Sequence, residues 1–380
     1  MIQTKTSINN VALILGLFYL FYFAMVGVYV IYMPKVLKDI GYSDIEVGAI
    51  YTSAPLMRFI LPFIFKKWIK LTNRVYLISL VFTLIITLIF FLTIHNFYIY
   101  LLLNLLYGGA MGVALPFVEV IAIEQIGKKN YGKVRLWGSI GFILIALILG
   151  KILNNPTLAL IFLSLTAFFT MLIGFILVKY DKKSEQKDEN IDYSSFSLKK
   201  YWAFWASIFL FQFSFGGFYN FFTIYETQNH IPLDIVSYLW TFGVICEIFM
   251  LIFQTSIIQK YSLFNLILIT SISAIFRWLI LAYYPNNLPL VLLSQATHAL
   301  NFALYYTATI AYVYQLYSQK RLAQQFYLGI GFGLGGAFGA IVSGVVYNYS
   351  PKALFIFEAM MALISVIFLL IHIKRKEYVS

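Results

Sequence analysis

The feature that most constrains this chain is a series of apolar stretches, each about 20 residues long, that recurs from one end to the other. A helix that crosses the hydrocarbon core of a bilayer needs about 20 predominantly apolar residues. We therefore predict an all-α integral membrane protein with twelve transmembrane helices. Their expected positions are about 10–33, 44–65, 74–94, 98–126, 136–154, 157–178, 200–227, 234–258, 263–284, 289–316, 323–347 and 352–373.

The composition supports this class of protein. Charged residues make up 11% of the chain, whereas they make up about 25% of a typical soluble domain. Residues 10–33 form a full-length span without a small-residue cleavage site, so we expect this span to be retained. The single cysteine, Cys246, excludes an intrachain disulfide and a cysteine-rich metal site, and we expect no metal.

The net charge of +12 is compatible with a nucleic-acid partner, but the positions of the charges argue against one. Lysines and arginines are concentrated in the loops after even-numbered spans and in the C-terminal tail. Cytoplasmic loops of membrane proteins carry such an excess of basic residues. The pattern predicts a multi-pass protein of the inner (cytoplasmic) membrane, with both termini in the cytoplasm.

One polar segment divides the chain. Residues 180–199 are mixed in charge and poor in apolar residues, which is typical of a flexible linker. We predict an N-terminal six-helix bundle over 1–179, a cytoplasmic linker over 180–199 and a pseudo-symmetric C-terminal six-helix bundle over 200–380. This layout is typical of secondary transporters, whose binding site lies between the halves near the middle of the membrane. A channel or a membrane enzyme is the alternative.

Ionisable residues within the spans indicate where function resides, because charged groups at membrane depth are costly. Glu119 lies in an apolar helix that we expect to end at Gly127, and Arg135 lies just before the expected start of the next helix. Other spans carry polar residues at helical spacing, which we expect to line a shared cavity. These residues are Arg58, Asn104, Gln212, Tyr219, Glu226, Glu247, Arg277, His298 and Asn301.

Several ionisable residues of the spans also have a structural interpretation. Arg58 and Arg277 could hold helices together, and His298 could be a packing residue. For Glu226, a functional role and simple solvation near the outer surface both remain open. Glu124 is expected at the cytoplasmic interface. Glu358 has no partner that the sequence suggests.

Enzyme chemistry is not indicated. The chain has no HExxH, GxSxG or P-loop motif, so we expect neither an enzyme nor a cofactor, and an ion gradient would supply the energy. Gly331, Gly333 and Gly336 match GxGxxG formally. They lack the preceding strand and the acidic residue that a dinucleotide site needs, and closely spaced small residues serve helix packing in membranes.

Several motifs resemble a known group of transporters. YGKVRLWGSIG at 131–141, PFVE at 116–119, YLWTFGVICEI at 238–248 and SAIFRW at 273–278 are similar to the major facilitator superfamily. The similarity points to its phenylpropionate permease-like branch. The lactose permease and the nucleoside–proton symporters are more distantly similar.

This resemblance implies roles for individual residues. Glu119 and Arg135 fall where the lactose permease holds its substrate, while Glu247, Arg277 and His298 fall in its coupling network. Asn301 stands where the lactose permease has a proton-carrying carboxylate, so that detail does not transfer. The loop after the second span keeps basic residues but lacks the usual glycine and aspartate of the superfamily.

Together these observations predict a monomeric proton-coupled symporter that imports a small organic solute, an aromatic or other organic acid, by alternating access. The expected substrate-binding residues are Glu119, Arg135, Arg58, Asn104, Tyr219 and Asn301, and the expected proton-coupling residues are Glu247, Arg277 and His298. The alternatives are a sugar or nucleoside–proton symporter and a drug/proton antiporter. A membrane receptor or scaffold without transport is the alternative of a different class.

Overall fold

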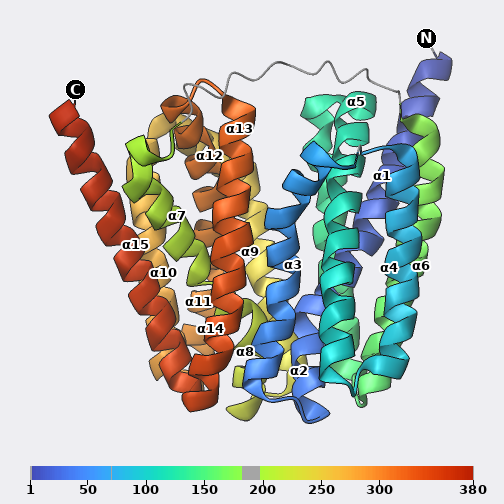
Figure 1. The fold of residues 1–380 in the computed structure, drawn as a ribbon, viewed down its shortest axis with the longest axis horizontal. Helices are drawn as coiled ribbons and strands as arrows, with labels where there is room; N and C mark the ends of the chain where they lie inside the picture. Colours follow the sequence, from blue (N-terminus) through green and yellow to red (C-terminus); the bar gives the residue numbers. More distant parts are fainter. Residues whose placement is uncertain (1, 70, 182–196, 380) are drawn as a thin grey trace. The chain divides into compact units, whose positions relative to one another are not determined.

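The structure is a computed structural model that describes residues 2–69, 71–181 and 197–379 (Figure 1). The part of the chain that it describes is built from helices. Most of the predicted linker 180–199 lies outside the described residues. Ten described helices are long and apolar enough to cross a membrane. They are Asn10–Asp39, Asp44–Phe65, Asn73–Thr93, Phe97–Gly127, Asn130–Ile152, Pro156–Tyr180, Leu233–Lys260, Leu263–Tyr283, Leu322–Tyr349 and Pro351–Lys374.

The two remaining predicted spans are discontinuous helices. The span expected at 200–227 consists of α7 (Trp202–Phe213) and α8 (Gly216–Gln228), separated by a turn. The span expected at 289–316 consists of α11 (Leu288–Ala296), the π-helical segment η4 (Ala299–Leu304) and α12 (Tyr305–Leu316). With these two, the all-α membrane fold with twelve spans is confirmed.

The helix that carries the predicted site differs in detail from the prediction. Residues Phe97–Ile152 form α5, which is interrupted at Gly127, where φ is +74°. Glycine accepts this backbone conformation without steric cost, and it commonly ends a helix. The next span begins at Asn130, so its expected start after Arg135 is wrong and Arg135 lies inside the helix.

Several helices begin at a side chain that accepts a backbone N–H group. Asn96 accepts from the N–H of Ile99, Asn155 from that of Leu158 and Asn287 from that of Leu290. The first N–H groups of a helix have no partner within the helix, so these amides stabilise the helix starts. They mark α5, α6 (Pro156–Leu177) and α11 as separate elements after short turns.

The described residues divide into two compact units. Unit 1 comprises the described parts of 1–42, 60–187 and 233–241, and unit 2 those of 43–59, 188–232 and 242–380. Each unit therefore takes in a short segment from the other half of the sequence. The predicted division at 180–199 stays a prediction.

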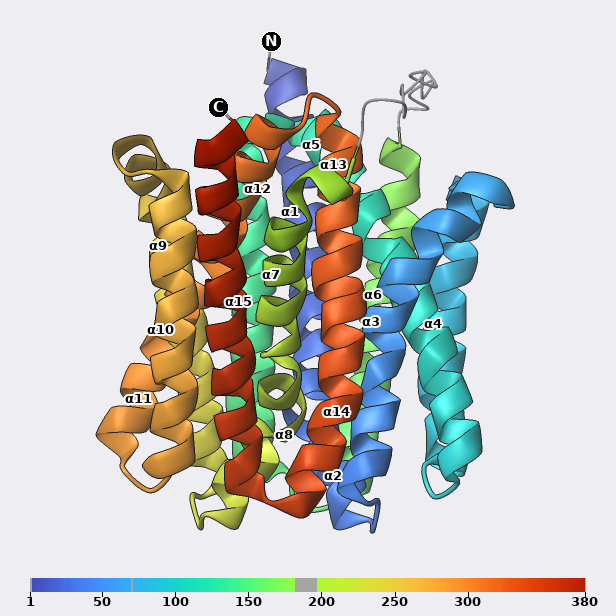
Figure 2. The same ribbon diagram turned by 60° about the vertical axis from the view of Figure 1, so that its left-hand side comes forward.

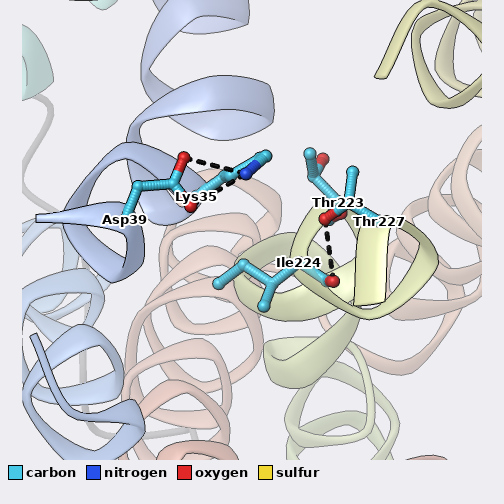
Figure 3. A network of polar contacts seen from close by, with 5 residues as sticks. All are labelled: Lys35, Asp39, Thr223, Ile224 and Thr227. Carbon is cyan, nitrogen blue, oxygen red and sulfur yellow. Dashed lines mark hydrogen bonds and ion pairs between the residues drawn. The ribbon is translucent and has the colours of Figure 1, made fainter. Parts of the chain in front are cut away.

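Unit 1 is built around the packing of α1 (Ile2–Gly27) on α5, with α4 (Asn73–Thr93) and α6 beside them. After α1 the chain continues through the π-helical segment η1 (Val28–Tyr32) into α2 (Met33–Asp39). In α2, Lys35 Nζ lies 2.8 Å from the carboxylate of Asp39 (Figure 3). This pair neutralises one of the few basic residues in the connection after the first span.

Unit 2 contains α7, α8, α10 (Leu263–Tyr283) and α15 (Pro351–Val379), and α15 packs against both α7 and α10 (Figure 2). Of the segment 43–59, residues 44–59 belong to α3 (Asp44–Lys67), and residues 242–260 belong to α9 (Leu233–Lys260). The remaining elements are η2 (Val178–Tyr180) in unit 1 and η3 (Lys199–Tyr201), α13 (Lys320–Tyr327), η5 (Leu328–Gly335) and α14 (Gly336–Tyr349) in unit 2.

The contact between α1 and α5 gives a test of the packing in unit 1. A Cβ atom added at Gly141 would lie 2.0 Å from the carbonyl oxygen of Leu20, so the two helices would have to move apart. We expect Gly141→Ala to destabilise the protein by about 1–3 kcal/mol, the usual cost of overpacking. Thermal unfolding in detergent measures the loss. Gly132→Ala in the same helix is the control, because among the described residues no atom outside the adjoining stretch of this helix lies within 4 Å of the added Cβ. Equal unfolding temperatures for the two variants would contradict this packing.

Candidate functional site

Unit 1 holds a cluster of charged and aromatic side chains, the Glu119 cluster, which consists of Tyr19, Phe23, Glu119, Tyr131 and Arg135. The Tyr131 hydroxyl donates to Glu119 Oε1 at 3.0 Å. The guanidinium of Arg135 lies over the ring of Phe23, 3.8 Å from its centroid, and 5.4 Å from that of Tyr19. Within the described chain, no ion pair joins Glu119 to Arg135.

The geometry of the Glu119 cluster follows from the helix break. Glu119 precedes Gly127, whereas Tyr131 and Arg135 follow it, one helical turn apart on the same face. Both Glu119 and Arg135 are half-buried, so part of each side chain is accessible to a ligand. A carboxylate and a guanidinium that do not neutralise each other can bind complementary polar groups of a solute, while the aromatic rings cover its apolar part.

Asn104, the other predicted substrate residue of unit 1, is fully buried. Its Oδ1 accepts from the Tyr29 hydroxyl at 3.0 Å, and its Nδ2 donates to the carbonyl of Tyr100 at 2.9 Å. Both ends of the amide are therefore engaged within unit 1. The structure does not bring Asn104 into the Glu119 cluster, and substrate binding by this residue stays a prediction.

Unit 2 brings together the predicted coupling residues in a second cluster, the His298 network, which consists of Glu247, Arg277, Gln295 and His298. Glu247 Oε2 lies 3.6 Å from His298 Nε2, and Arg277 Nη1 lies 3.2 Å from His298 Nδ1. Arg277 Nη2 donates to Gln295 Oε1 at 3.4 Å. The four side chains come from α9, α10, α11 and the residue just before η4.

Aromatic rings surround the guanidinium of Arg277, which is completely buried. Its Cζ lies 4.2 Å from the ring centroid of Phe218 and 5.7 Å from that of Phe215. Trp278 packs edge-on against Phe215. A guanidinium stacks well on aromatic faces, so these rings fix its plane and leave its edges for polar partners.

The other predicted residues of unit 2 lie around this network. The Tyr219 hydroxyl interacts electrostatically with Arg277, Glu247 and Arg58, although Arg58 itself is exposed. Asn301 Nδ2 donates to the carbonyl of Thr270 at 2.8 Å and to Ser273 Oγ at 2.7 Å. Asn301 thus joins η4 to α10, and its role in substrate binding stays a prediction.

Three carboxylates outside the predicted site have distinct surroundings. Glu124 is exposed, as expected for an interfacial residue. Glu226 is completely buried, so its interpretation as a solvated residue is wrong. Neither oxygen of Glu226 has a hydrogen-bond partner among the described residues, while the nearby Thr227 hydroxyl bonds the carbonyls of Thr223 and Ile224 (Figure 3). Glu358 is buried and accepts from a backbone N–H of α8.

Sequence reasoning missed several members of both clusters. Tyr131 was detectable, because it lies four residues before Arg135 on one helix face. Gln295 was also detectable, because it lies three residues before His298 in the same predicted span. Phe23 and Phe218 carry no comparable signal, since they reach the charged residues from other helices. No group of three or more His, Cys, Asp or Glu residues is placed to hold a metal ion in the described ranges.

Membrane-spanning helices with buried charged networks are typical of polytopic membrane transporters. The chain belongs to the MFS_1 like family of the major facilitator superfamily, which it matches over residues 12–357. It is therefore a multi-pass membrane transporter that binds a small-molecule substrate, and it is not an enzyme. The resemblance to the superfamily seen in the sequence is confirmed.

Two relatives are each 24% identical to this chain over the aligned residues. One is the probable 3-phenylpropionic acid transporter of Escherichia coli (strain K12), which aligns over 364 residues, 92% of this chain and 94% of the relative. The other is the uncharacterized transporter YwbF of Bacillus subtilis (strain 168), which aligns over 345 residues, 87% of this chain and 86% of the relative.

Solved structures show the same fold. The crystal structure of the nucleoside transporter NupG matches with a TM-score of 0.78 at 18% identity and covers 96% of this chain and 99% of its own. An auto inhibited peptide transporter of the POT family matches with a TM-score of 0.72 at 10% identity and covers 97% of each chain. At these identities the likeness supports the fold alone.

Proposed function

We propose that the protein is a proton-coupled symporter that imports a small organic acid by alternating access. The observation that carries this proposal is the His298 network, in which a titratable carboxylate, a histidine and a buried arginine are connected within unit 2. Such groups at membrane depth are characteristic of proton relays in transporters.

The contacts in the His298 network assign its protons. A guanidinium only donates hydrogen bonds, so His298 Nδ1 accepts from Arg277 and carries no hydrogen. The hydrogen of the neutral ring is then on Nε2, which faces the carboxylate of Glu247. Glu247 lies at the half-buried end of this series of contacts. Its carboxylate is the group that we propose binds and releases the transported proton.

The proposed substrate class rests on the arginines and on one relative. Arg135 presents a guanidinium among aromatic rings, which suits a carboxylate attached to an aromatic group. Arg58 is a second cation, and it is exposed on the segment of α3 that belongs to unit 2. The E. coli relative is described as a probable 3-phenylpropionic acid transporter, and we propose an acid of similar chemistry.

A sugar or nucleoside is the second candidate substrate. The Glu119 carboxylate, oriented by the Tyr131 hydroxyl, is a good acceptor for the hydroxyl groups of such a solute. NupG, whose fold is similar, is a nucleoside transporter. The organic acid is favoured because the guanidinium of Arg135 is not neutralised by Glu119.

The proposed location follows from the charge pattern. We propose the inner membrane as the location, with both termini in the cytoplasm, because basic residues are concentrated in the even-numbered loops. The transporter would act as a monomer and without a cofactor, and the proton gradient would supply the energy.

Uptake by energised cells tests this function. Labelled phenylpropionate, lactose and uridine are offered with and without a protonophore, and the proposal expects accumulation of the acid that disappears with the protonophore. Accumulation that resists the protonophore would contradict proton symport. Accumulation of uridine or lactose instead would select the second substrate class, and extrusion of the solutes would select an antiporter.

Glu247→Gln is expected to abolish accumulation but to retain exchange of substrate across the membrane. The amide keeps the shape of the carboxylate but cannot carry a proton, so the solute would equilibrate and not concentrate. Counterflow in membrane vesicles measures exchange, and uptake driven by an imposed pH gradient measures accumulation. Full gradient-driven accumulation by this variant would exclude Glu247 as the obligatory carrier.

A further inference from the structure

Unit 1 carries a groove on its surface, between α4 and α6, that the proposed transport mechanism does not use. The groove has a volume of about 380 Å³, and all of its walls are apolar. The residues that line it are Leu77, Ile78, Val81, Phe82, Ile85 and Phe175. Ile78, Ile85 and Phe175 are exposed, so the groove opens away from the interior of unit 1.

The packing of α4 on α6 explains the shape of the groove. The two helices approach closely at Gly174, where an added Cβ would lie 2.3 Å from Leu80 Cδ1. Phe175, the next residue of α6, therefore forms a second wall beside α4. On α4 the lining residues recur every three to four positions, so they share one face of the helix. From Leu77 to Ile85 the groove is about 12 Å long, at 1.5 Å per residue.

Two cations extend the groove at one end. Arg74 lies three residues before Leu77 on α4, so it continues the face that lines the groove. Lys179 lies four residues after Phe175, in the turn η2 that continues α6. Both cations are exposed, and among the described residues neither of them takes part in an ion pair.

Both cations lie at the ends of membrane spans. Arg74 is the second residue of the span Asn73–Thr93, and Lys179 is the last but one of the span Pro156–Tyr180. The start of α4 and the end of α6 lie at the same end of unit 1 (Figure 1). The ends of spans reach the level of the lipid head groups, and half of the hydrocarbon core is about 15 Å thick. The groove therefore fits within one leaflet of the bilayer.

Basic residues outnumber acidic residues around this end of the groove. The connection 66–74 contains four basic residues and no acidic residue. Near the end of α6 the acidic residues are Asp181, which is half-buried, and Glu124, whose neighbour Gln125 donates to the carbonyl of Tyr180. Within the described part of the chain, neither carboxylate pairs with Lys179. An anion at this end would thus meet an excess of positive charge.

We infer that the groove binds an anionic phospholipid, with an acyl chain along α4 and the phosphate at Arg74 and Lys179. The apolar walls suit an acyl chain, while guanidinium and ammonium groups form charge-assisted hydrogen bonds with phosphate. Basic sites between membrane helices on the cytoplasmic side commonly bind anionic head groups. Only the choice of the cytoplasmic leaflet rests on the orientation that we propose.

Two sets of variants separate the charge from the groove. The double variant Arg74→Gln, Lys179→Gln removes both cations, and Lys151→Gln is its control, because Lys151 is an exposed cation at the end of α5. Ile78→Trp fills the groove with a larger side chain. Its control is Leu92→Trp, since Leu92 is 85% exposed on α4 and does not line the groove.

Native mass spectrometry of the whole protein in detergent counts the bound lipids. Anionic phosphatidylglycerol and neutral phosphatidylcholine are titrated with the same acyl chains, and the parent protein should bind phosphatidylglycerol more tightly. The double variant should lose about tenfold to thirtyfold in affinity for phosphatidylglycerol, since each basic residue near an anionic surface contributes roughly fivefold. Lys151→Gln should bind both lipids like the parent. Ile78→Trp should weaken binding of both lipids, and Leu92→Trp should weaken neither.

Several results would overturn the inference. One is equal affinity of the parent for the two lipids, and another is equal affinity for phosphatidylglycerol in the double variant and in Lys151→Gln. Displacement of the lipid by glycerol phosphate at similar concentration would indicate a site for a soluble anion instead. A dimer that Ile78→Trp abolishes would show that a second copy of the chain covers the groove.

Photo-crosslinking provides a second measurement if Ile78→Trp is not recovered as a folded protein. A photoreactive amino acid in place of Phe82 should label phosphatidylglycerol, and adding the double variant should remove this labelling; equal labelling of both lipids would contradict the inference. Neither measurement uses a transported solute or a proton gradient. The lipid site can therefore fail while the proposed transport function stands, and the reverse also holds.

Discussion

Gly344→Ala is expected to reduce transport at least about tenfold, although it adds only one methyl group. Within unit 2, Gly344 of α14 faces the segment 43–59 of α3. An added Cβ would lie 2.6 Å from the carbonyl oxygen of Asp44 and 3.1 Å from the Cα of Gly48. The reciprocal substitution at Gly48 would place a Cβ 2.7 Å from the carbonyl oxygen of Ala340.

The size of this effect follows from the cost of separating two helices. Overpacking costs about 1–3 kcal/mol, and about 1.4 kcal/mol changes an equilibrium tenfold. The segment 43–59 comes from the first half of the sequence and α14 from the second. In the alternating access that we propose, the two halves of the sequence would meet and part in each cycle, so destabilising this contact within unit 2 would deplete one of the two states that the proposal requires.

Gly336→Ala is the matched control. It lies on the same helix and faces the same segment, but an added Cβ would lie 3.4 Å from the side chain of Pro55, an ordinary contact. We expect this variant to transport within about twofold of the parent, because the added methyl forces no shift of either helix. Uptake of the identified substrate, normalised to the amount of protein in the membrane, measures both variants.

A labelling experiment reports on the contact without any substrate. Thr52 lies on α3 and its hydroxyl donates to the carbonyl of Ala337 on α14 at 3.3 Å. In a Cys246→Ser background, Thr52→Cys should react faster with a polar maleimide when Gly344→Ala is present. Parental transport together with an unchanged labelling rate would show that this contact does not limit the cycle.

Hydropathy predicted the continuous spans well, because the bilayer imposes a length on each apolar segment. The expected span 44–65 coincides with Asp44–Phe65, and 263–284 ends one residue after Leu263–Tyr283. Hydropathy does not report the path of the backbone within a span. The breaks at 214–215 and around Ala299–Leu304 were therefore missed, although both adjoin the His298 network.

The charged residues of the site were identified by their cost at membrane depth, but their partners were not. His298, Glu247 and Arg277 were expected together, and the structure brings them together. Glu358 had no expected partner, because the group that it binds is a backbone N–H. Every residue except proline has such a group, so residue types do not indicate it. Glu226 was ambiguous, since burial depends on neighbouring helices.

The second large effect concerns substrate recognition in unit 1. Arg135→Lys is expected to weaken binding of an organic acid by about tenfold to a hundredfold, although the positive charge remains. The planar guanidinium stacks over Phe23, 3.8 Å from the ring centroid, and can offer two parallel N–H groups to a carboxylate. Hydrogen bonds to charged groups are worth about 1.5–3 kcal/mol, which gives this range.

Glu119→Gln is the companion variant that distinguishes the two substrate classes. For a carboxylate substrate, removing the negative charge at Glu119 should cost little or improve binding, because it removes a like charge. For a sugar or nucleoside, the same change weakens an acceptor of substrate hydroxyl groups and should cost more than Arg135→Lys. Tyr131→Phe should follow Glu119→Gln, since the Tyr131 hydroxyl orients that carboxylate at 3.0 Å.

Calorimetric binding to purified protein at one fixed pH measures these affinities directly and needs no proton gradient. Lys133→Gln is the control, because Lys133 is an exposed cation two residues before Arg135 on the same helix. If Arg135→Lys is no weaker than Lys133→Gln, the stacked guanidinium does not hold the substrate. A larger loss in Glu119→Gln than in Arg135→Lys would assign the transporter to hydroxyl-bearing solutes, because the acceptor and not the cation would then carry the binding energy.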